Sequence, residues 1–283
     1  IKHVDVGDGL TVSRCYIPST LDDNAILTQN DPEYEKRLRM LNSSLYNALR
    51  YGNWDIADGC VFDEFDRAKH VIKPFTLKSA EWVKVCSMDW GYSKPYSIGW
   101  WAVNKDGRAI RYRELYGCKK NEPNTGVKES ALSVAKRALE LSIPDGVDTM
   151  IADPAVWGKI DKDDASIAEK FESVGWKMIK GNNDRLNGLQ IMHDMLINTA
   201  EDSRPMLMVF NTCTDFIRTI PLLMPSPTRP EDVDSTMEDH VYDESRYFLM
   251  SDFVKHPLRA LKKQNSTYSF KQTARGSSWN PYS

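Results

Sequence analysis

Residues Val83–Asp89 have the sequence V-K-V-C-S-M-D, a short and mostly apolar run that predicts a buried strand ending at a carboxylate. The turn Gly91–Pro95 follows it, and Tyr96–Asn104 is predicted to form a second strand. Asp106-Gly107 is a two-residue hairpin signal that leads into a third predicted strand, Ala109–Tyr116. The order predicts three antiparallel strands joined by hairpins.

Helices and strands are predicted to alternate after this antiparallel unit. Apolar residues at helical spacing predict a helix over Val127–Leu141, and Thr149–Ala152 is a short apolar strand. If that strand lies beside Val83–Asp89 after a right-handed crossover, the carboxyl ends of the two strands are neighbours. The other predicted elements are helices at Ser166–Val174, Asn187–Thr199, Thr214–Leu223 and Ser235–Met250, the last with a Ser235/Glu238 capping box, and strands at Trp176–Lys180 and Met206–Phe210. The sequence therefore predicts an α/β fold whose mixed sheet has three antiparallel strands followed by parallel strands, flanked by helices.

Composition places the chain among soluble globular proteins. It has 283 residues, of which 41% are hydrophobic and 27% charged, enough for a large core. No run approaches the roughly 18 apolar residues that a membrane-spanning helix needs, so no membrane association is expected. The five scattered cysteines contain no C-x-x-C pair, which argues against a disulfide framework or a zinc knuckle and favours a reducing compartment. The first residues have neither signal-peptide features nor an initiator Met, as expected for a fragment.

Charge is distributed unevenly along the chain. The 37 Lys and Arg residues against 40 Asp and Glu give a net charge of −3. Residues 253–283 contain no acidic residue and six basic ones, so an acidic body is followed by a basic tail. Three roles stay open for this tail, namely contact with DNA through counterion release, docking of a partner protein, or a solvated end.

Four aspartates have placements that suit metal chemistry. Asp89 and Asp153 each end a predicted strand, and Asp239 and Asp243 lie four residues apart on the last predicted helix, on one face. Clustered carboxylates repel one another unless a cation neutralises them, and hard oxygen ligands favour Mg²⁺ or Mn²⁺. Two such ions roughly 4 Å apart suit phosphodiester hydrolysis, because one activates water and the other stabilises the leaving oxygen. In the alternative interpretation, the aspartates form turns, caps or a solvated face, and His240 is a hydrogen-bonded surface histidine.

Three basic residues near these strand ends are candidates for contacts with a nucleic-acid backbone. Lys94 lies in the turn after the first strand, while Lys180 and Arg185 lie at and after the end of the fifth predicted strand. Solvated loop positions are the alternative for all three. Trp100 and Trp101 are adjacent on a predicted strand and so face opposite sides, which favours core packing over base stacking.

Three segments together resemble the nuclease domain of the large terminase subunit of tailed bacteriophages. They are Asp89-Trp90-Gly91, Ala152-Asp153-Pro154 and the run D-H-V-Y-D-E-S-R-Y at Asp239–Tyr247. The third is similar to the family's D-H-x-x-D-A-x-R-Y motif, with Glu244 where Ala is common. Upstream, residues 17–24 and 52–55 resemble the stretch that joins the family's motor domain to its nuclease.

The resemblance implies a ribonuclease H-like fold and a two-metal endonuclease, dependent on Mg²⁺ or Mn²⁺, that cuts concatemeric double-stranded viral DNA during genome packaging. By this resemblance Asp89, Asp153 and Asp243 are metal ligands, with Asp89 bridging the two ions. Asp239 is an auxiliary ligand and His240 handles a proton or a phosphate. Asp243 ranks above Asp239 because the family's ligand lies three residues after the His. The implied partners are double-stranded DNA, the portal protein and the small terminase subunit, at the portal vertex of the procapsid in the host bacterial cytoplasm.

The sequence also departs from this family. Family members carry a packaging ATPase with a P-loop, G-x-x-x-x-G-K-[ST], whereas here Gly158-Lys159 is followed by Ile160. We therefore expect no ATP site and no DNA translocation. The expected division is a linker and remnant of the motor domain at 1–78, the nuclease domain at 79–252 and a basic, flexible tail at 253–283. The rival functions are a non-catalytic module that couples motor to portal, and a related ribonuclease H-like resolvase or RNA-directed nuclease.

Overall fold

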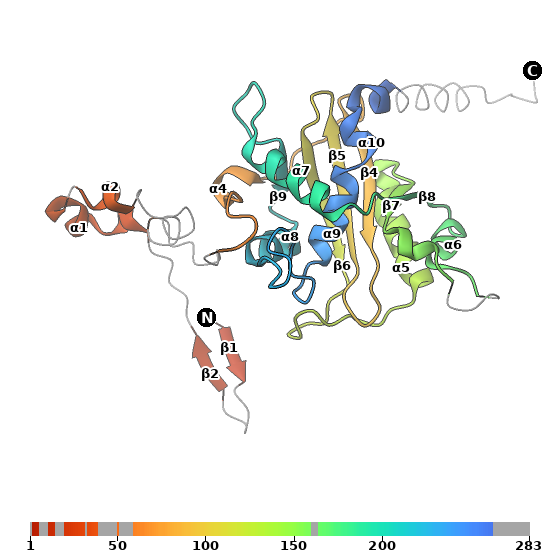
Figure 1. Cartoon of the computed structure of the whole chain (residues 1–283), viewed down its shortest axis with the longest axis horizontal. Coiled ribbons are helices and arrows are strands. Elements are labelled where there is room, and N and C mark those ends of the chain that lie inside the picture. Colours follow the sequence, from red (N-terminus) through yellow and green to blue (C-terminus); the bar gives the residue numbers. More distant parts are fainter. Residues whose placement is uncertain are drawn as a thin grey trace, which may run out of the picture.

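The computed structural model describes residues 2–5, 11–14, 20–31, 33–38, 50, 59–159 and 164–262 (Figure 1). Near the N-terminus, strands β1 (Lys2–Asp5) and β2 (Thr11–Arg14) pair with each other as an antiparallel hairpin. The short helices η1 (Leu21–Asp23), α1 (Ala25–Asn30) and α2 (Tyr34–Leu38) follow. Leucines at three- and four-residue spacing also predict a helix between Asp31 and Gly52, most of which lies outside the described residues, as do residues 17–19 and 52–55.

A seven-stranded mixed sheet forms the centre of the molecule. Its strands are, in spatial order, β3 (Val71–Ile72), β9 (Leu207–Phe210), β6 (Ala109–Tyr116), β5 (Ser97–Asn104), β4 (Trp82–Asp89), β7 (Thr149–Ala152) and β8 (Lys177–Lys180). The strands β4, β5 and β6 are antiparallel, whereas β7 and β8 extend the sheet in parallel on one side and β9 and β3 on the other. The predicted mixed sheet is therefore confirmed.

The pairing of β4 with β7 brings two predicted site residues together. Met88 on β4 lies opposite Ala152 on β7 in the parallel register, and the backbone N–H of Asp153 donates to the carbonyl of Met88 at 3.3 Å. Asp89 and Asp153 therefore end neighbouring strands at one edge of the sheet. This confirms that the two strands are parallel neighbours.

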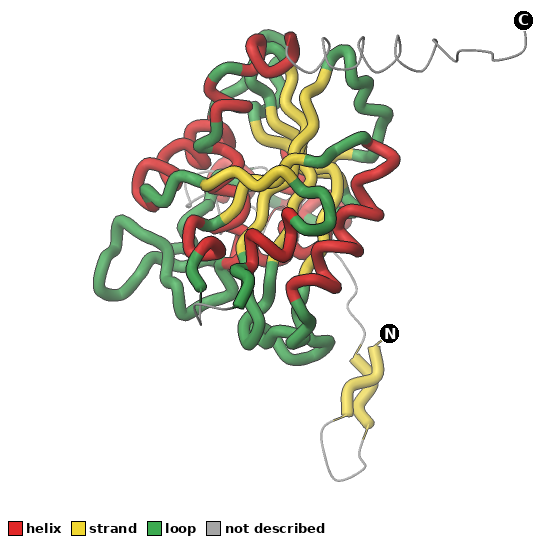
Figure 2. The backbone as a smooth tube through the Cα atoms, turned by 90° about the vertical axis from the view of Figure 1, so that its right-hand side faces the viewer, coloured by secondary structure: helices red, strands yellow, loops and turns green. Residues whose placement is uncertain are grey.

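Helices cover both faces of the sheet (Figures 1 and 2). The helices of this part of the chain are α4 (Arg67–His70), α5 (Ala131–Ser142), α6 (Ile167–Glu172), α7 (Arg185–Ile197), α8 (Thr214–Thr219), α9 (His240–Leu249) and α10 (Asp252–Lys255), with 3-10 turns η2 (Ile143–Asp145), η3 (Pro154–Trp157) and η4 (Ile220–Leu222). The fully buried indoles of Trp100 and Trp101 point to opposite faces, as predicted. The first donates to Ser142 on α5 and the second to Glu244 on α9, both at 2.8 Å.

The predicted hairpin at Asp106-Gly107 forms between the predicted strand ends, and the side-chain oxygen of Asn104 accepts there from the N–H groups of Asp106 and Arg108. Two predicted helix starts are wrong, the first because α5 begins at Ala131 rather than at Val127. The helix expected from Ser235 begins only at His240. Its capping box does not form, since Glu238 accepts instead from the Tyr116 hydroxyl at 2.9 Å and from the Arg218 guanidinium.

The core reaches beyond the predicted nuclease segment. Phe62 and Phe65 are buried against the sheet, as is Leu261 after α10. The proposed boundaries at 78 and 252 stay predictions, and the tail after Lys262 lies outside the described residues. Within the described ranges, every helix is too short or too polar to cross a membrane.

Candidate functional site

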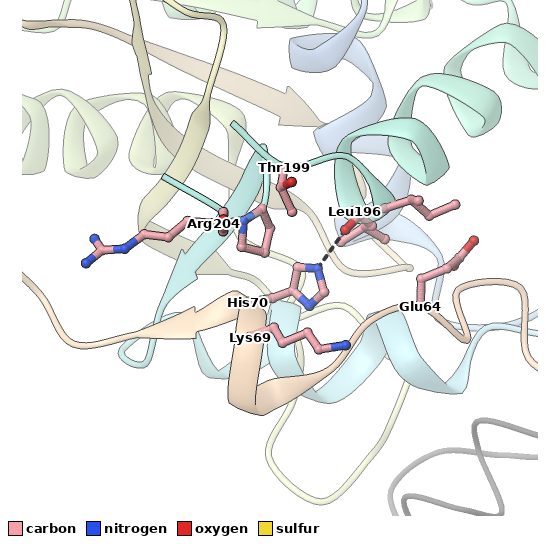
Figure 3. A pocket seen from close by; sticks show the side chains of 9 residues that line it. Glu64, Lys69, His70, Leu196, Thr199 and Arg204 are labelled. Atoms are coloured by element: carbon pink, nitrogen blue, oxygen red, sulfur yellow. Dashed lines mark hydrogen bonds between the residues drawn. The ribbon is translucent and has the colours of Figure 1, made fainter. Parts of the chain in front are cut away.

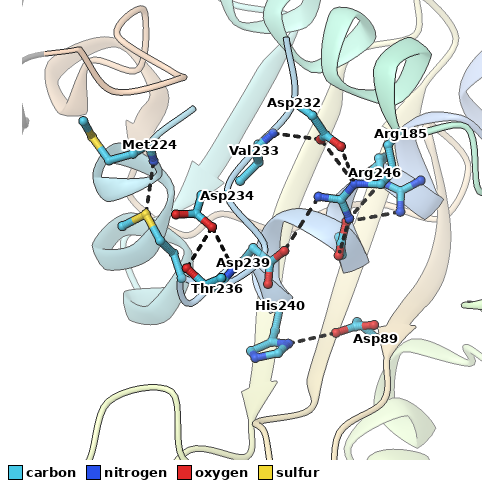
Figure 4. A network of polar contacts seen from close by, with 12 residues as sticks. Asp89, Arg185, Met224, Asp232, Val233, Asp234, Thr236, Asp239, His240 and Arg246 are labelled. Carbon is cyan, nitrogen blue, oxygen red and sulfur yellow. Dashed lines mark hydrogen bonds and ion pairs between the residues drawn. The ribbon is translucent and has the colours of Figure 1, made fainter. Parts of the chain in front are cut away.

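The site lies where β4 and β7 end and α9 begins (Figure 4). Asp89 is the last residue of β4. Asp153 directly follows β7 and also caps η3, since its Oδ1 accepts from the N–H of Ala155 at 2.9 Å. The capping interpretation and the site interpretation of Asp153 are therefore compatible.

The start of α9 brings a histidine to Asp89 from 151 residues further along the chain. His240 Nδ1 lies 3.1 Å from Asp89 Oδ2, and His240 Nε2 lies 3.0 Å from Asn124 Oδ1. The side chains of Asp89 and His240 are 13% and 14% exposed. This contact is consequently shielded from bulk water, although the edge remains open to it.

The remaining site carboxylates lie on the same helix end. Asp243 is in the first turn of α9 and Asp239 immediately precedes the helix, so that the Asp243 N–H donates to the Asp239 carbonyl at 2.9 Å. The two aspartates therefore lie one helical turn apart, as predicted, although only Asp243 is within the helix.

The pKa values show that these groups share one electrostatic environment. Burial raises the pKa of Asp89 to about 6, although the hydrogen bond with His240 lowers it. The nearby charges of Asp243 and Asp153 also raise this pKa. Burial likewise raises the pKa of Asp239 to about 7, with a further contribution from Asp243. Burial lowers the pKa of His240, but its hydrogen bond to Asp89 and the surrounding carboxylates outweigh this and raise it. The site therefore holds more negative charge than its surroundings neutralise.

Arg185, the first residue of α7, supplies the principal positive charge beside these carboxylates. Its Nη1 donates to both oxygens of Asp243 at 2.9 and 3.0 Å, and its Nε donates to Asp232 at 2.9 Å. Its Nη2 lies 3.8 Å from Asp239. The structure thus places this predicted DNA-contact residue inside the acidic cluster.

A second arginine fixes Asp243 from the interior. Arg246 is buried, and its Nε and Nη2 donate to Asp243 Oδ1 at 3.2 and 3.1 Å. It also donates to the carbonyl of Asn182 and to the side chain of Asn183, in the loop after β8. Arg246 therefore connects α9 to the end of the neighbouring strand.

The two predicted lysines lie outside this cluster. Lys94 is exposed in the loop after Asp89. Lys180 ends β8, and its Nζ lies 5.4 Å from the centre of the Trp157 ring, on the turn that Asp153 caps. Both lie on loops or strand ends next to the site, and their contact with DNA stays a prediction.

Three further features of the site were missed from the sequence. Asp232 follows a proline-rich segment, and Asn124 lies in a long loop, so neither carried a pattern. Glu244 is fully buried and accepts from Ser87, from Ser97 at 3.3 Å, from Trp101 at 2.8 Å and from the Arg111 guanidinium. The unusual glutamate in the D-H-x-x-D run was visible in the sequence, but its partners on three strands were not.

The donor set fits a hard divalent cation. Asp89, Asp153, Asp239 and Asp243 offer carboxylate oxygens, which Mg²⁺ and Mn²⁺ prefer. Burial, and to a smaller extent the neighbouring carboxylates, raise the pKa of Asp89 and Asp239, and a bound cation would oppose both effects. Among the described residues, however, no three His, Cys, Asp or Glu side chains are arranged to hold a metal, and Arg185 pairs with both oxygens of Asp243.

A cavity of about 530 Å³ lies elsewhere, between α4 and the end of α7 (Figure 3). Its lining includes Glu64, Lys69 and Arg204, and none of the site aspartates. The buried His70 at its wall is already bonded, since its Nε2 lies 3.0 Å from the Leu196 carbonyl. The site aspartates are therefore separate from this cavity.

Comparison with solved structures places this arrangement among known folds. The large terminase of a thermophilic bacteriophage is 22% identical, with a TM-score of 0.53 over 81% of this chain and 54% of that one. The same protein in complex with ATP-γ-S gives 21% identity and a TM-score of 0.52, again over 81% and 54%. The P22 large terminase nuclease domain gives 15% identity and a TM-score of 0.53, over 69% of this chain and 92% of that one. No protein-family model and no curated protein sequence matches.

These likenesses define the class of fold. The chain has the ribonuclease H-like fold of a large terminase nuclease domain, which confirms at the level of fold the resemblance drawn from the sequence. Because the P22 nuclease domain is covered almost completely, the described sheet and its helices correspond to that domain as a whole. The chain spans about half of the large terminase of the thermophilic phage, 54% of its length.

Proposed function

We propose that this chain is an endonuclease, dependent on Mg²⁺ or Mn²⁺, that cuts concatemeric double-stranded viral DNA during genome packaging. The observation that carries the proposal is the convergence of Asp89, Asp153 and Asp243 at one sheet edge, where the latter two raise the pKa of the first. The fold shared with the P22 nuclease domain supports it. An acidic edge of this kind has little affinity for DNA until cations neutralise it.

Each residue has a task in this proposal. Asp89, Asp153 and Asp243 would hold the cations, with Asp239 as an auxiliary ligand. When bound, the two ions would supply an activated water and stabilise the leaving oxygen. His240 would share a proton with Asp89, since its Nδ1 lies 3.1 Å from Asp89 Oδ2. Lys94, Lys180 and Arg185 would contact the DNA backbone, which requires that Arg185 leave Asp243.

The wider setting belongs to the same proposal. The portal protein and the small terminase subunit would be partners, and cutting would take place in the host cytoplasm at the portal vertex. Residues 1–78 would be the remnant of a motor domain and residues 253–283 a basic tail. Without a P-loop in this chain, no ATP would be bound here.

Cleavage of a supercoiled plasmid tests the proposal. Purified chain with Mn²⁺ is expected to nick the plasmid, while Asp89→Asn, Asp153→Asn and Asp243→Asn each reduce the rate by about 10³-fold or more, as for loss of about 4 kcal/mol of transition-state stabilisation. Asp148→Asn is a matched control, because Asp148 pairs with Lys177 on the surface away from the cluster. Undiminished cutting by the three site variants, with folding verified by circular dichroism, overturns the assignment.

One observation favours the docking module as a second candidate. Arg185 engages both oxygens of Asp243, so part of the acidic edge is charge-balanced by the chain itself. Titration calorimetry separates the two functions, since the docking module predicts no Mn²⁺ binding at millimolar concentration. Linear duplex, four-way junction and RNA–DNA hybrid compared side by side separate the packaging nuclease from a resolvase or an RNA-directed nuclease.

A further inference from the structure

Asn124 reaches the site from the loop between β6 and α5. Its Oδ1 lies 3.0 Å from His240 Nε2, while the other ring nitrogen of His240 lies 3.1 Å from Asp89 Oδ2 (Figure 4 shows the latter contact). The imidazole is therefore held between an amide and a carboxyl group. Each of its two nitrogens faces an oxygen.

The backbone determines which way the Asn124 amide faces. Its Nδ2 donates to the carbonyls of Thr236 at 3.2 Å and Met237 at 3.1 Å. Rotating the amide by 180° would place its oxygen next to these two carbonyl oxygens. The rotated amide could make no hydrogen bond there, because carbonyl oxygens cannot donate. The oxygen consequently faces His240. Because an amide oxygen only accepts, the hydrogen of that bond belongs to His240 Nε2.

The loop that carries Asn124 is fixed relative to Asp89. The N–H of Gly126 donates to the carbonyl of Ser93 at 2.9 Å, in the loop that follows Asp89. A Cβ at Gly126 would collide with the backbone of Lys94, so the two loops are in direct contact. Asn124 itself has a φ of 57°, a left-handed conformation that costs energy for any residue except glycine, although less for Asn than for most. A residue that keeps such strain beside a site points to a function there.

We propose that Asn124 is a positioning residue, which holds His240 with Nε2 protonated so that Nδ1 is the nitrogen facing Asp89. Any proton shared between the histidine and Asp89 then lies between Nδ1 and Asp89 Oδ2, because the Nε2 hydrogen is already donated to Asn124. The geometric part of this proposal stands on the hydrogen bonds alone. Its consequence for DNA cleavage rests on the proposed nuclease function.

Nitrogen NMR of the full chain labelled with ¹⁵N-histidine tests the proposal. The signals of His240 are identified among those of the five histidines by their loss in His240→Gln. The test variant is Asn124→Gly, because glycine accepts the left-handed backbone and removes only the amide. The matched control is Asn121→Gly in the same loop, where Asn121 also has a left-handed φ, 65°.

In the wild-type protein and in Asn121→Gly, the Nε2 of neutral His240 is expected to have the shift of a protonated nitrogen. In Asn124→Gly this shift moves toward the unprotonated value, because both tautomers become populated. Plasmid cleavage falls about 10-fold in Asn124→Gly, the effect typical of losing an outer-shell partner, and is unchanged in Asn121→Gly.

Unchanged His240 shifts in Asn124→Gly overturn the proposal, and so do equal changes in both variants, since these would assign the effect to the loop backbone. If the wild-type protein cuts no DNA but the shifts move as expected, the nuclease function fails and the positioning role stands. If the protein cuts DNA and the shifts do not move, the reverse holds.

Discussion

Asp243 and Glu244 are adjacent acidic residues on α9, and they lie in opposite environments. Glu244 is fully buried, with Arg111 and three neutral donors around its carboxylate. Asp243 has a 15% exposed side chain at the edge of the sheet, where other carboxylates crowd it. Glu244 has one cationic partner, Arg111, which also lies 3.4 Å from the buried Glu114. Asp243 accepts from two arginines, Arg185 and Arg246, but lies among other carboxylates at the edge. The first carboxylate fixes the position of the helix, and the second belongs to the candidate site.

Glu244 fixes α9 against three strands. Its partners Ser87, Ser97 and Arg111 come from β4, β5 and β6, and Ser87 lies two residues before Asp89. Arg111 also stacks on Trp101, with 5.2 Å from its Cζ to the ring centre. A side chain at Gly99 would collide with both Glu244 and Arg111, so the glycine leaves the space that the ion pair fills. The distance between Asp89 and the start of α9 thus depends on a buried ion pair.

The largest expected effects distinguish the two acidic residues: substitution of Asp243 lowers the cleavage rate, and substitution of Glu244 lowers the stability of the fold. Asp243→Asn is expected to reduce plasmid cleavage by about 10³-fold or more and to cost less stability than Glu244→Gln, because the asparagine oxygen can still accept from Arg246 and the nearby carboxylates no longer repel a charge there. Glu244→Gln breaks the buried ion pair with Arg111, which then keeps only Glu114 at 3.4 Å, and is expected to destabilise the protein by about 3–5 kcal/mol. Urea unfolding and nicking rates measure both. A stable Glu244→Gln, or an unstable Asp243→Asn, would remove the distinction.

A double-mutant cycle sharpens the interpretation of the core pair. Arg111→Met alone is expected to cost about as much as Glu244→Gln, because it leaves the buried Glu244 without its cationic partner. The double variant Arg111→Met/Glu244→Leu is expected to be less destabilised than the sum of the single variants by at least about 1 kcal/mol. Additive losses in urea unfolding would mean that the two groups do not act as a pair.

The excess charge at the edge predicts an unusual pH dependence. The folded pKa values of Asp89 and Asp239 are about 6 and about 7, above the usual value of 3.8. The folded state thus binds these protons more tightly than the unfolded chain, so the groups are neutral in both states below about pH 4. Stability therefore falls as pH rises from about 4 to about 6 for Asp89 and to about 7 for Asp239, and the loss is complete above these values. The raised pKa of His240 acts in the same direction, since its favourable contribution is lost as pH rises.

Removing one of these charges tests that dependence. In metal-free buffer, Asp239→Asn is expected to be about 2–3 kcal/mol more stable than the wild type at pH 7.5 and equally stable at pH 4. Urea unfolding at the two pH values gives the comparison. If Asp239→Asn differs from the wild type by the same stability at pH 4 and at pH 7.5, the effect comes from packing rather than from charge.

The smallest expected effect concerns Arg185, the residue that neutralises part of the edge. Arg185→Gln removes a positive charge that competes with added cations, so Mn²⁺ affinity measured by calorimetry is expected to rise about 10-fold, or about 1.4 kcal/mol. The matched control is Arg218→Gln, since Arg218 pairs with Asp215 and Glu238 rather than with Asp243. A fall in affinity in Arg185→Gln would show that Arg185 assists the cation instead of competing with it.

Much of this molecule could be predicted from local patterns. Apolar runs located β4, β5, β6, β7, β8 and β9 within one or two residues, since a strand or helix is specified by neighbours a few positions apart. The errors occurred where a side chain prefers a distant partner to a local one. Glu238 bonds Tyr116 and Arg218 instead of capping a helix, and α9 therefore starts five residues later than predicted from Ser235.

By itself the sequence determined the succession of strands and helices and the placement of Asp89 and Asp153 at neighbouring strand ends, because periodicity and crossover handedness act locally and by general rule. Only the tertiary structure decided the partners of these groups. His240 lies 151 residues from Asp89, Glu244 lies 133 from Arg111, and Arg185 lies 58 from Asp243. Ionised and hydrogen-bonding side chains pair according to where the fold places them, and no local pattern encodes that choice. The separation of a core carboxylate from an edge carboxylate on consecutive residues is therefore a property of the fold.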